Sequence, residues 1–239
     1  MALIASVFLL CTLLFTSGTR HALYDFLYVK VVEIPLNGDY EIRPDIAQGP
    51  YGHSETFIHM MNRLQPYAAI NGTFYDHRPK PLGDIVISGK VVNHGHLKSA
   101  IALTAGGKAT IVHHDEGGFD WTGFKSGLAA GPRLVQDGKL CLDPNADGFH
   151  KASLSLRGWR SGIGITRENK LLLVTVKRPL TLKEFARTMI DLGAVDAINL
   201  DGGGACGLYH DGSFLVVPSL PMTNVLSVYR KKPGKAGSR

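Results

Sequence analysis

Apolar residues recur at helical spacing in two stretches of the chain. The first stretch extends from Glu55 to about Leu64, with Ser54 as the expected N-cap and Pro66 as the residue that ends it. Its buried face is expected to consist of Phe57, Met60, Met61 and Leu64. We therefore predict a first helix over residues 55–64.

The second helical stretch begins with a capping box, Thr181-Leu-Lys-Glu184. In this motif the threonine hydroxyl accepts from a main-chain N–H of the first turn, and the glutamate side chain reaches back to the N–H of the cap residue. The apolar stripe that follows is formed by Leu182, Phe185, Met189 and Leu192. Gly193 is expected to stop this helix, because glycine readily takes the left-handed conformation that follows helix ends.

Most other apolar runs have the length and the β-branched content of strands. They lie at 27–36, 67–72, 195–200, 214–217 and 225–229, and strand signals repeat between residues 85 and 176. The expected hairpin turns are Ser88-Gly89, Gly106-Gly107, Asp137-Gly138, Glu168-Asn169 and Asp211-Gly212. No repeat or long linker interrupts the pattern. We predict an α+β fold: a single compact, sheet-rich domain over residues 27–230, with mixed or antiparallel strands and two main helices.

Composition and charge narrow the class of protein. The chain has 239 residues, of which 44% are hydrophobic and 19% charged, as in ordinary globular proteins. Five of the six excess positive charges lie in residues 230–239, so the rest of the chain is nearly neutral and no nucleic-acid partner is expected. Residues 231–239 are predicted to form a disordered basic tail, with weak attraction to an anionic envelope or membrane surface as the alternative.

Residues 1–20 resemble a leader segment. They are apolar from Ala2 to Phe15 and then small and polar, which is typical of a secretory signal, although no basic residue precedes the apolar run. An uncleaved anchor, a misassigned start and an internal strand are the alternatives. A signal predicts a secreted or periplasmic, envelope-associated protein. Its removal would leave Cys141 and Cys206, which would either pair in an oxidising compartment or stay as buried thiols.

The most informative segment runs from Ala197 to Gly207. An apolar run ends in Asp201 and three consecutive glycines, which predicts a bare main-chain loop whose N–H groups face an anion beside a carboxylate. That combination suits a substrate that carries both phosphate and sugar. The glycine spacing also matches the dinucleotide fingerprint, but a hairpin turn rather than a helix follows it, so no nicotinamide or flavin site is expected.

Three further segments are predicted to be rigid turns that hold polar groups at strand ends. They are Ile70-Asn-Gly-Thr-Phe-Tyr-Asp76, residues 127–135 and residues 157–164. Each one alone is also explained as a structural turn whose Asn or Asp bonds its own backbone. Cys206 follows the glycines, but no surrounding pattern marks it as a nucleophile.

The order of the motifs resembles that of the phosphodiester glycosidase family. The motifs are Ala-Ile-Asn-Gly-Thr-Phe at 69–74, Ala-Gly-Pro-x-Leu-Val-x-x-Gly-Lys at 130–139, Arg-Ser-Gly-Ile-Gly at 160–164, Thr-Leu-x-Glu-Phe-Ala at 181–186, and Leu-Gly-Ala-x-x-Ala-Ile-Asn-Leu-Asp-Gly-Gly-Gly at 192–204. The resemblance covers about residues 28–230. It implies a hydrolase, often an exported one, that breaks the bond between a sugar's anomeric carbon and a phosphodiester oxygen in a glycan or envelope polymer.

By matching position, the resemblance implies Asp201, Asn71 and Arg160 as catalytic residues. The substrate-binding candidates are Gly72, Asp84, Arg133, Gly202, Gly203 and Gly204. The departing phosphate is a weak base, so strong general-acid help is less necessary than in ordinary glycoside hydrolysis. Asp201 would act as nucleophile or as base for water, Arg160 and the glycine N–H groups would stabilise the phosphate, and Asn71 would orient substrate oxygens.

The candidates for a second participating carboxylate are Glu55, Asp76 and Asp84, and both retention and inversion of the anomeric configuration are compatible with the sequence. The family's usual serine after the glycines is replaced by Ala205-Cys206, and the arginine expected before the last strand is absent from Pro221-Met-Thr-Asn-Val225. A non-catalytic carbohydrate-binding or envelope-binding protein is therefore the alternative function. A phosphatase or nuclease is a third class, but it usually requires a metal cluster.

Histidine pairs at His94 and His96 and at His113 and His114, with His53 and His59 upstream, have spacing that can chelate a metal. Ten histidines spread over a chain are mostly surface or hydrogen-bonded residues, so no metal site and no cofactor is predicted. A calcium ion near the glycine loop is the other alternative.

Overall fold

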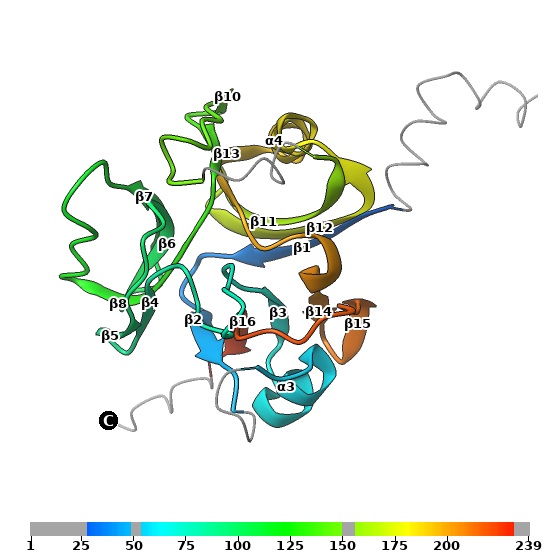
Figure 1. Ribbon diagram of the computed structural model, residues 1–239. Helices are drawn as coiled ribbons and strands as arrows, with labels where there is room; N and C mark the ends of the chain where they lie inside the picture. Colours follow the sequence, from blue (N-terminus) through cyan, green and yellow to red (C-terminus); the bar gives the residue numbers. More distant parts are fainter. Residues whose placement is uncertain (1–27, 49–53, 150–155, 232–239) are drawn as a thin grey trace, which may run out of the picture.

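The computed structural model describes residues 28–48, 54–149 and 156–231. Within them the chain forms three antiparallel sheets and two α-helices, which confirms the predicted sheet-rich α+β class (Figure 1). Every strand pairing in these three ranges is antiparallel, so the described strands do not use the mixed pairing that the sequence left open. The leader at 1–20, the tail beyond Lys231 and His53 lie outside the described residues. No helix in the described ranges is long and apolar enough to cross a membrane.

The largest sheet has six strands. In the order in which they lie side by side, they are β1 (Val29–Pro35), β12 (Lys170–Leu180), β11 (Gly158–Thr166), β13 (Ala194–Asn199), β9 (Arg133–Gln136) and β10 (Lys139–Leu140). Its centre is apolar on both faces, with Leu171, Leu172, Leu173 and Val174 all buried. A strand buried on both faces belongs between two layers rather than at the surface.

The other two sheets have five strands each. The second sheet runs β15 (Ser213–Val216), β14 (Leu208–His210), β3 (Ala68–Asn71), β16 (Asn224–Arg230) and β2 (Tyr40–Ile46). The third runs β5 (Lys90–Asn93), β4 (Ile85–Ile87), β8 (Phe124–Ala130), β6 (Ser99–Thr104) and β7 (Ala109–His113). Strand β2 was not predicted, because Tyr40-Glu-Ile-Arg-Pro-Asp-Ile46 alternates only weakly and contains a proline.

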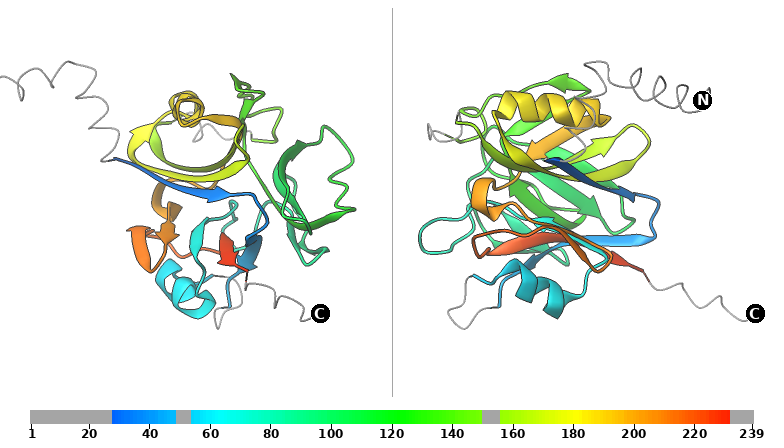
Figure 2. Two further views of the ribbon diagram at one scale, coloured as in Figure 1. Left: turned by 180° about the vertical axis from the view of Figure 1, so that it is seen from behind. Right: turned by 90° about the vertical axis from the view of Figure 1, so that its right-hand side faces the viewer.

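The three sheets share one hydrophobic core. It includes Ile34 of β1, Ile70 of β3, Ile101 of β6, Ile163 of β11 and Leu226 of β16, which together come from all three sheets. The two helices cover the outer faces, α4 (Leu182–Asp191) on the six-stranded sheet and α3 (Phe57–Leu64) on the second sheet (Figure 2). The layers therefore run helix, sheet, sheet, helix, with the third sheet to one side.

Helix α4 matches its prediction and helix α3 starts later than predicted. The capping box of Thr181 and Glu184 is present, and Leu182, Phe185 and Met189 are buried. The N-cap of α3 is Thr56 rather than Ser54, and its hydroxyl accepts from the N–H of His59. The reason is tertiary, because Glu55 forms an isolated β-bridge with Met222 and is drawn out of the helix.

The expected hairpin turns all occur between neighbouring strands. Ser88, Asp137, Asn169 and Asp211 adopt positive φ there, as do several of the glycines beside them. One expectation was wrong: residues 158–164 lie within strand β11 and are not a turn. A Cβ on Gly162 would lie 2.8 Å from Phe185, so its glycine lets helix α4 pack closely on the sheet.

Candidate active site

Asp201 lies two residues after the end of β13, the strand that the sequence predicted would deliver it. Strand β13 pairs antiparallel with β11, with Gly162 opposite Asn199, so the end of β13 lies beside the start of β11. The N–H of Leu200 continues this contact by donating to the carbonyl of Ser161 at 2.8 Å. Two motifs that are 41 residues apart in sequence, at Arg160 and Asp201, therefore meet at one edge of the sheet.

The loop from Asp201 to Gly207 is held by the second sheet. The side-chain nitrogen of Asn71 donates to the carbonyl of Asp201 at 2.7 Å, and its oxygen accepts from the N–H of Gly207 at 3.1 Å. The N–H of Asp201 donates to the carbonyl of Gly72 at 3.2 Å. Asn71 was expected to orient substrate oxygens, but both ends of its amide contact the protein's own main chain. It acts here as a positioning residue for the loop.

Gly72 also has a packing role. A Cβ at this position would lie 1.7 Å from the side-chain oxygen of Asn224, which is far closer than any real contact. That oxygen accepts from the N–H of Thr73 at 2.9 Å, so it is fixed in place. Gly72 therefore brings β3 close to β16 and is not among the residues that line the cleft described below.

The three glycines after Asp201 form a short turn with main-chain N–H groups available. Residues Gly203–Ala205 form one turn of 3-10 helix, closed by the N–H of Ala205 on the carbonyl of Gly202. Within the described ranges, no hydrogen bond uses the N–H of Gly203 or Gly204. Gly203 has a φ of +60° and open space around it. The turn is bare, as the glycine run predicted.

A cleft of about 570 Å³ opens beside this turn. It is lined by Phe74, Tyr75, Leu82, His96, Leu97, Gly148, Phe149, Leu156, Arg157, Gly158, Trp159, Arg160, Asp201, Gly202 and Gly203. Of the predicted site residues, the structure brings Asp201, Arg160, Gly202 and Gly203 together here. Gly204 turns away and packs against Ser219 and Leu220.

Asp201 is the one carboxylate among the described residues that line this cleft. Burial raises the pKa of its carboxyl to about 7, although the N–H of Gly202, which donates to it at 2.9 Å, acts in the opposite direction. The pKa of Tyr75 is also raised, first by burial and then by the negative charge of Asp201. A carboxyl poised near neutral pH in a cleft is typical of a catalytic group.

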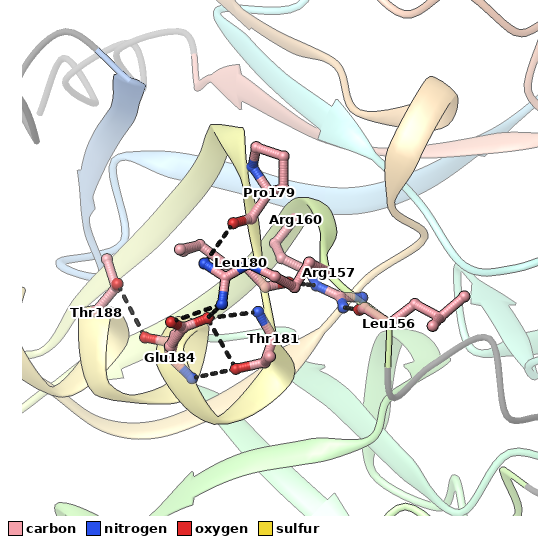
Figure 3. Close-up of polar contacts among 8 residues, drawn as sticks. All are labelled: Leu156, Arg157, Arg160, Pro179, Leu180, Thr181, Glu184 and Thr188. Carbon is pink, nitrogen blue, oxygen red and sulfur yellow. Dashed lines mark hydrogen bonds and ion pairs between the residues drawn. The ribbon is translucent and has the colours of Figure 1, made fainter.

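Two arginines bring positive charge to the same cleft, and Figure 3 shows how they are held. Arg160 is 6% exposed and donates to the main-chain carbonyls of Leu180 and Leu156. Burial lowers its pKa, but a guanidinium stays charged at neutral pH. Arg157 donates to Glu184 at 2.9 Å and to the carbonyl of Pro179 at 3.0 Å.

Glu184 fixes Arg157 from the first turn of helix α4. The pKa of Glu184 is lowered to about 2, chiefly by the N–H of Thr181 and then by Arg157 and the threonine hydroxyl. The carboxylate is therefore ionised at neutral pH. The capping box, which the sequence showed only as a helix start, thus also orients a cleft arginine.

The structure places Asp84 and Arg133 outside the cleft lining. Asp84 accepts from the N–H of Gly95 at 2.7 Å and from the indole of Trp121 at 2.8 Å, so it holds the segment that brings His96 and Leu97 to the cleft. The main-chain N–H of Arg133 donates to Asp147 at 2.8 Å. Both residues support the walls of the cleft from behind.

Asp147 is a buried carboxylate that the sequence did not single out. It accepts from the hydroxyl of Ser99 at 2.6 Å, lies 3.2 Å from Nδ1 of His113, and is 3% exposed. It therefore ties β6, β7 and β9 to the loop that supplies Gly148 and Phe149 to the cleft. Only the fold brings these groups together, because they span 48 residues of sequence.

The other carboxylates considered as partners of Asp201 are engaged elsewhere. Asp76 accepts from the N–H groups of Arg78 and Lys80, and Glu55 forms an ion pair with Arg63 at 2.6 Å. His59 also pairs with Glu55 and His113 with Asp147. The described part of the chain contains no cluster of three or more His, Cys, Asp or Glu side chains suited to a metal ion.

The two described cysteines are unpaired. Cys206 is buried, and burial raises the pKa of its thiol to about 12, so it is protonated at neutral pH and is not a nucleophile. Cys141 is partly buried at the end of β10, and burial is the main reason that its pKa is also raised.

Sequence reasoning missed Tyr75, Trp159, Arg157 and the aromatic wall of Phe74 and Phe149. Position in the motifs was the available signal, since Phe74 and Tyr75 directly follow Asn71-Gly-Thr, and residues 157–159 directly precede Arg160. Phe149 had no such signal.

The fold agrees with comparisons to known proteins. The phosphodiester glycosidase family model matches residues 65–229, and no curated protein matches. A hypothetical protein from Synechocystis has a TM-score of 0.73 at 18% identity, over 85% of this chain and 59% of that one. This chain thus spans less than two thirds of that protein's length.

Two further solved structures share the fold. The catalytic domain of zebrafish N-acetylglucosamine-1-phosphodiester alpha-N-acetylglucosaminidase, auto-inhibited by its pro-peptide, has a TM-score of 0.64 at 18% identity, over 85% of this chain and 89% of that one. A candidate exported protein from Burkholderia pseudomallei has a TM-score of 0.65 at 14% identity, over 84% of this chain and 73% of that one. With the family model matching well over half of its length, this chain belongs to the phosphodiester glycosidase family.

Proposed function

We propose that this protein is a hydrolase that cleaves the bond between a sugar's anomeric carbon and a phosphodiester oxygen. The observation that carries the proposal is the position of Asp201. It is the one carboxylate among the described cleft residues, it has a pKa near 7, and it shares the cleft with Arg157, Arg160 and the glycine turn. Family membership supports the same reaction class.

The cleft residues divide into two sets by charge. Arg157 and Arg160 are cationic and suit the phosphate, and the N–H group of Gly203 supplies a neutral donor nearby. Donors that are fixed before the reaction stabilise charge as it develops on the leaving phosphate. Their main-chain partners already hold the arginine side chains, so little reorganisation is needed.

A single carboxylate is sufficient for this chemistry. Cleavage of the bond to the anomeric carbon releases a phosphate monoester, which is a weak base and needs little protonation, and this removes the requirement for a second carboxyl as general acid. Asp201 in its ionised form then either attacks the anomeric carbon, expelling the phosphate and forming a glycosyl ester that water hydrolyses, or removes a proton from the water that displaces the phosphate. Positive charge on the sugar ring is stabilised by the same carboxylate.

The test is to incubate the purified protein with a panel of sugar-1-phosphodiesters, with and without chelator, and to measure released sugar. We expect release in both conditions and loss of release in Asp201→Asn. Unchanged kcat in Asp201→Asn would contradict the assignment. Loss of release with chelator would instead indicate a metal-dependent reaction.

A non-catalytic binding protein is distinguished by the same panel. It would bind a sugar-1-phosphodiester in calorimetry without releasing sugar in a sensitive assay. We further propose export to the cell envelope or beyond, as the leader predicts, and fractionation of expressing cells would test that location. The substrate is then a glycan or an envelope polymer, and the basic tail would add weak attraction to an anionic surface.

A further inference from the structure

Five consecutive residues, Leu156 to Arg160, line the cleft. Apolar and basic side chains are interleaved there, because Leu156 and Trp159 stand in the same short segment as Arg157 and Arg160. In the proposed substrate, the phosphate that would lie beside the two arginines carries two ester groups. One is the sugar beside Asp201, and the other must lie close to this segment.

The apolar members of the segment are unusually accessible. Leu156 is 65% exposed and Trp159 is 37% exposed, although both are large hydrophobic side chains. Further apolar residues that line the same cleft are Phe74, Leu82, Leu97 and Phe149. They belong to one hydrophobic cluster, in which the rings of Phe74 and Phe149 are 5.2 Å apart.

Aromatic rings alone would not identify the second ester group, because rings also stack on sugars. Leu156 separates the two cases. An aliphatic side chain has no π face and gains little from a hydroxylated ring, whereas it gains from burial against alkyl or aryl groups. Its exposure beside the phosphate-binding arginines therefore points to an apolar neighbour.

We propose that the cleft accepts amphiphilic sugar-1-phosphodiesters, in which the second group on the phosphate is an alkyl or aryl chain that contacts Leu156 and Trp159. This inference rests on the proposed function and names its substrate class. A hydrophilic second group, such as another sugar, would leave these two side chains in contact with water.

The experiment compares methyl, butyl and hexyl esters of one sugar-1-phosphate, whose leaving groups have nearly equal basicity. Affinity is measured by calorimetry with Asp201→Asn, which removes turnover, and kcat/KM is measured with the native protein. Each methylene that is buried is expected to tighten binding up to about fourfold. Both affinity and kcat/KM are expected to increase along the series.

Two variants test the named contacts, and one serves as a control. Leu156→Ser and Trp159→Ala are expected to flatten the dependence on chain length. Leu140→Ser changes a leucine that is 40% exposed on β10, outside the cleft lining, and should keep the native slope. Thermal melting confirms that each variant is folded.

The outcomes separate this inference from the proposed function. Affinity and kcat/KM that are the same for all three esters would overturn the apolar subsite while leaving the glycosidase proposal intact. Chain-length-dependent binding without any sugar release would support the subsite and contradict the glycosidase. A slope that persists in both Leu156→Ser and Trp159→Ala would also overturn the subsite as placed.

Discussion

The side-chain amide of Asn71 donates a 2.7 Å hydrogen bond to the main-chain carbonyl of Asp201. The same amide accepts from the N–H of Gly207 at 3.1 Å, so one side chain of the second sheet fixes both ends of a loop that follows the six-stranded sheet. Asn71 is 1% exposed. The position of the cleft carboxylate thus depends on a contact between two sheets.

Asn71→Ala is expected to lower both stability and activity. The change leaves the carbonyl of Asp201 and the N–H of Gly207 without their partner, which costs about 2–4 kcal/mol of unfolding free energy. Sugar release should decrease more than substrate affinity, because the carboxylate loses its fixed position. Urea unfolding and kinetics measure the two effects.

Asn62→Ala is the matched control for that experiment. Asn62 is exposed on helix α3, and its removal should change the unfolding free energy by less than about 0.5 kcal/mol. Equal losses in the two variants would show that the amide of Asn71 has no special role.

The pH dependence of activity is expected to follow Asp201. Its pKa is raised to about 7 by burial, and the proposed nucleophile or base must be ionised. We expect kcat/KM to increase as the pH rises through about 7 and then to level off. His96 also lines the cleft, so a His96→Gln variant serves as a control and should show the same increase in kcat/KM with pH. Loss of that increase in the variant would assign it to the histidine.

Stability should respond to pH in the opposite direction. A carboxyl whose folded pKa is above its unfolded value of 3.8 binds its proton more tightly in the folded state, so stability falls as the pH rises from about 4 to about 7. Asp201→Asn removes this pH-dependent effect of the carboxyl on the unfolding free energy. The variant is therefore expected to gain stability relative to the native protein between pH 5 and pH 8. Urea unfolding measures the free energy of unfolding of both proteins at pH 5 and at pH 8. A difference between variant and native protein that is the same at the two pH values would contradict the burial of this charge.

Gly72→Ala is expected to destabilise the fold through overpacking. The new methyl group would lie 1.7 Å from the side-chain oxygen of Asn224, and repacking costs about 1–3 kcal/mol or more. Gly106→Ala is the control, because its nearest neighbour would be 3.8 Å away. Denaturant unfolding of both variants measures the difference, and a Gly72→Ala variant as stable as the control would disprove the close approach of β3 and β16.

Asp147→Asn should disturb the cleft from a distance. The amide retains the shape of the side chain, but its NH₂ end cannot accept from Ser99 or from the N–H of Arg133. Hydrogen bonds to a charged group contribute about 1.5–3 kcal/mol each, so a clear loss of stability is expected. Asp120→Asn, on an exposed turn, is the control. An unchanged KM together with unchanged stability would show that this network does not support the cleft wall.

The local elements followed from local physical rules. The capping box of Thr181 and the two-residue turns such as Asp211-Gly212 depend on groups within a few residues, and they formed as predicted. The start of helix α3 did not, because the bridge between Glu55 and Met222 joins residues far apart in sequence. Local propensity cannot represent such a partner.

The sequence by itself determined most of the strands, the hairpin turns, the second helix and the bare glycine turn after Asp201, but not strand β2 or the strand over residues 158–164. Only the tertiary structure decided which strands share a sheet, which residues line the cleft and that Asn71 contacts the loop rather than the cleft. The physical reason is that hydrophobic periodicity and turn chemistry act over a few residues. The raised pKa of Asp201 and the exposure of Leu156 depend instead on burial, which three sheets create together.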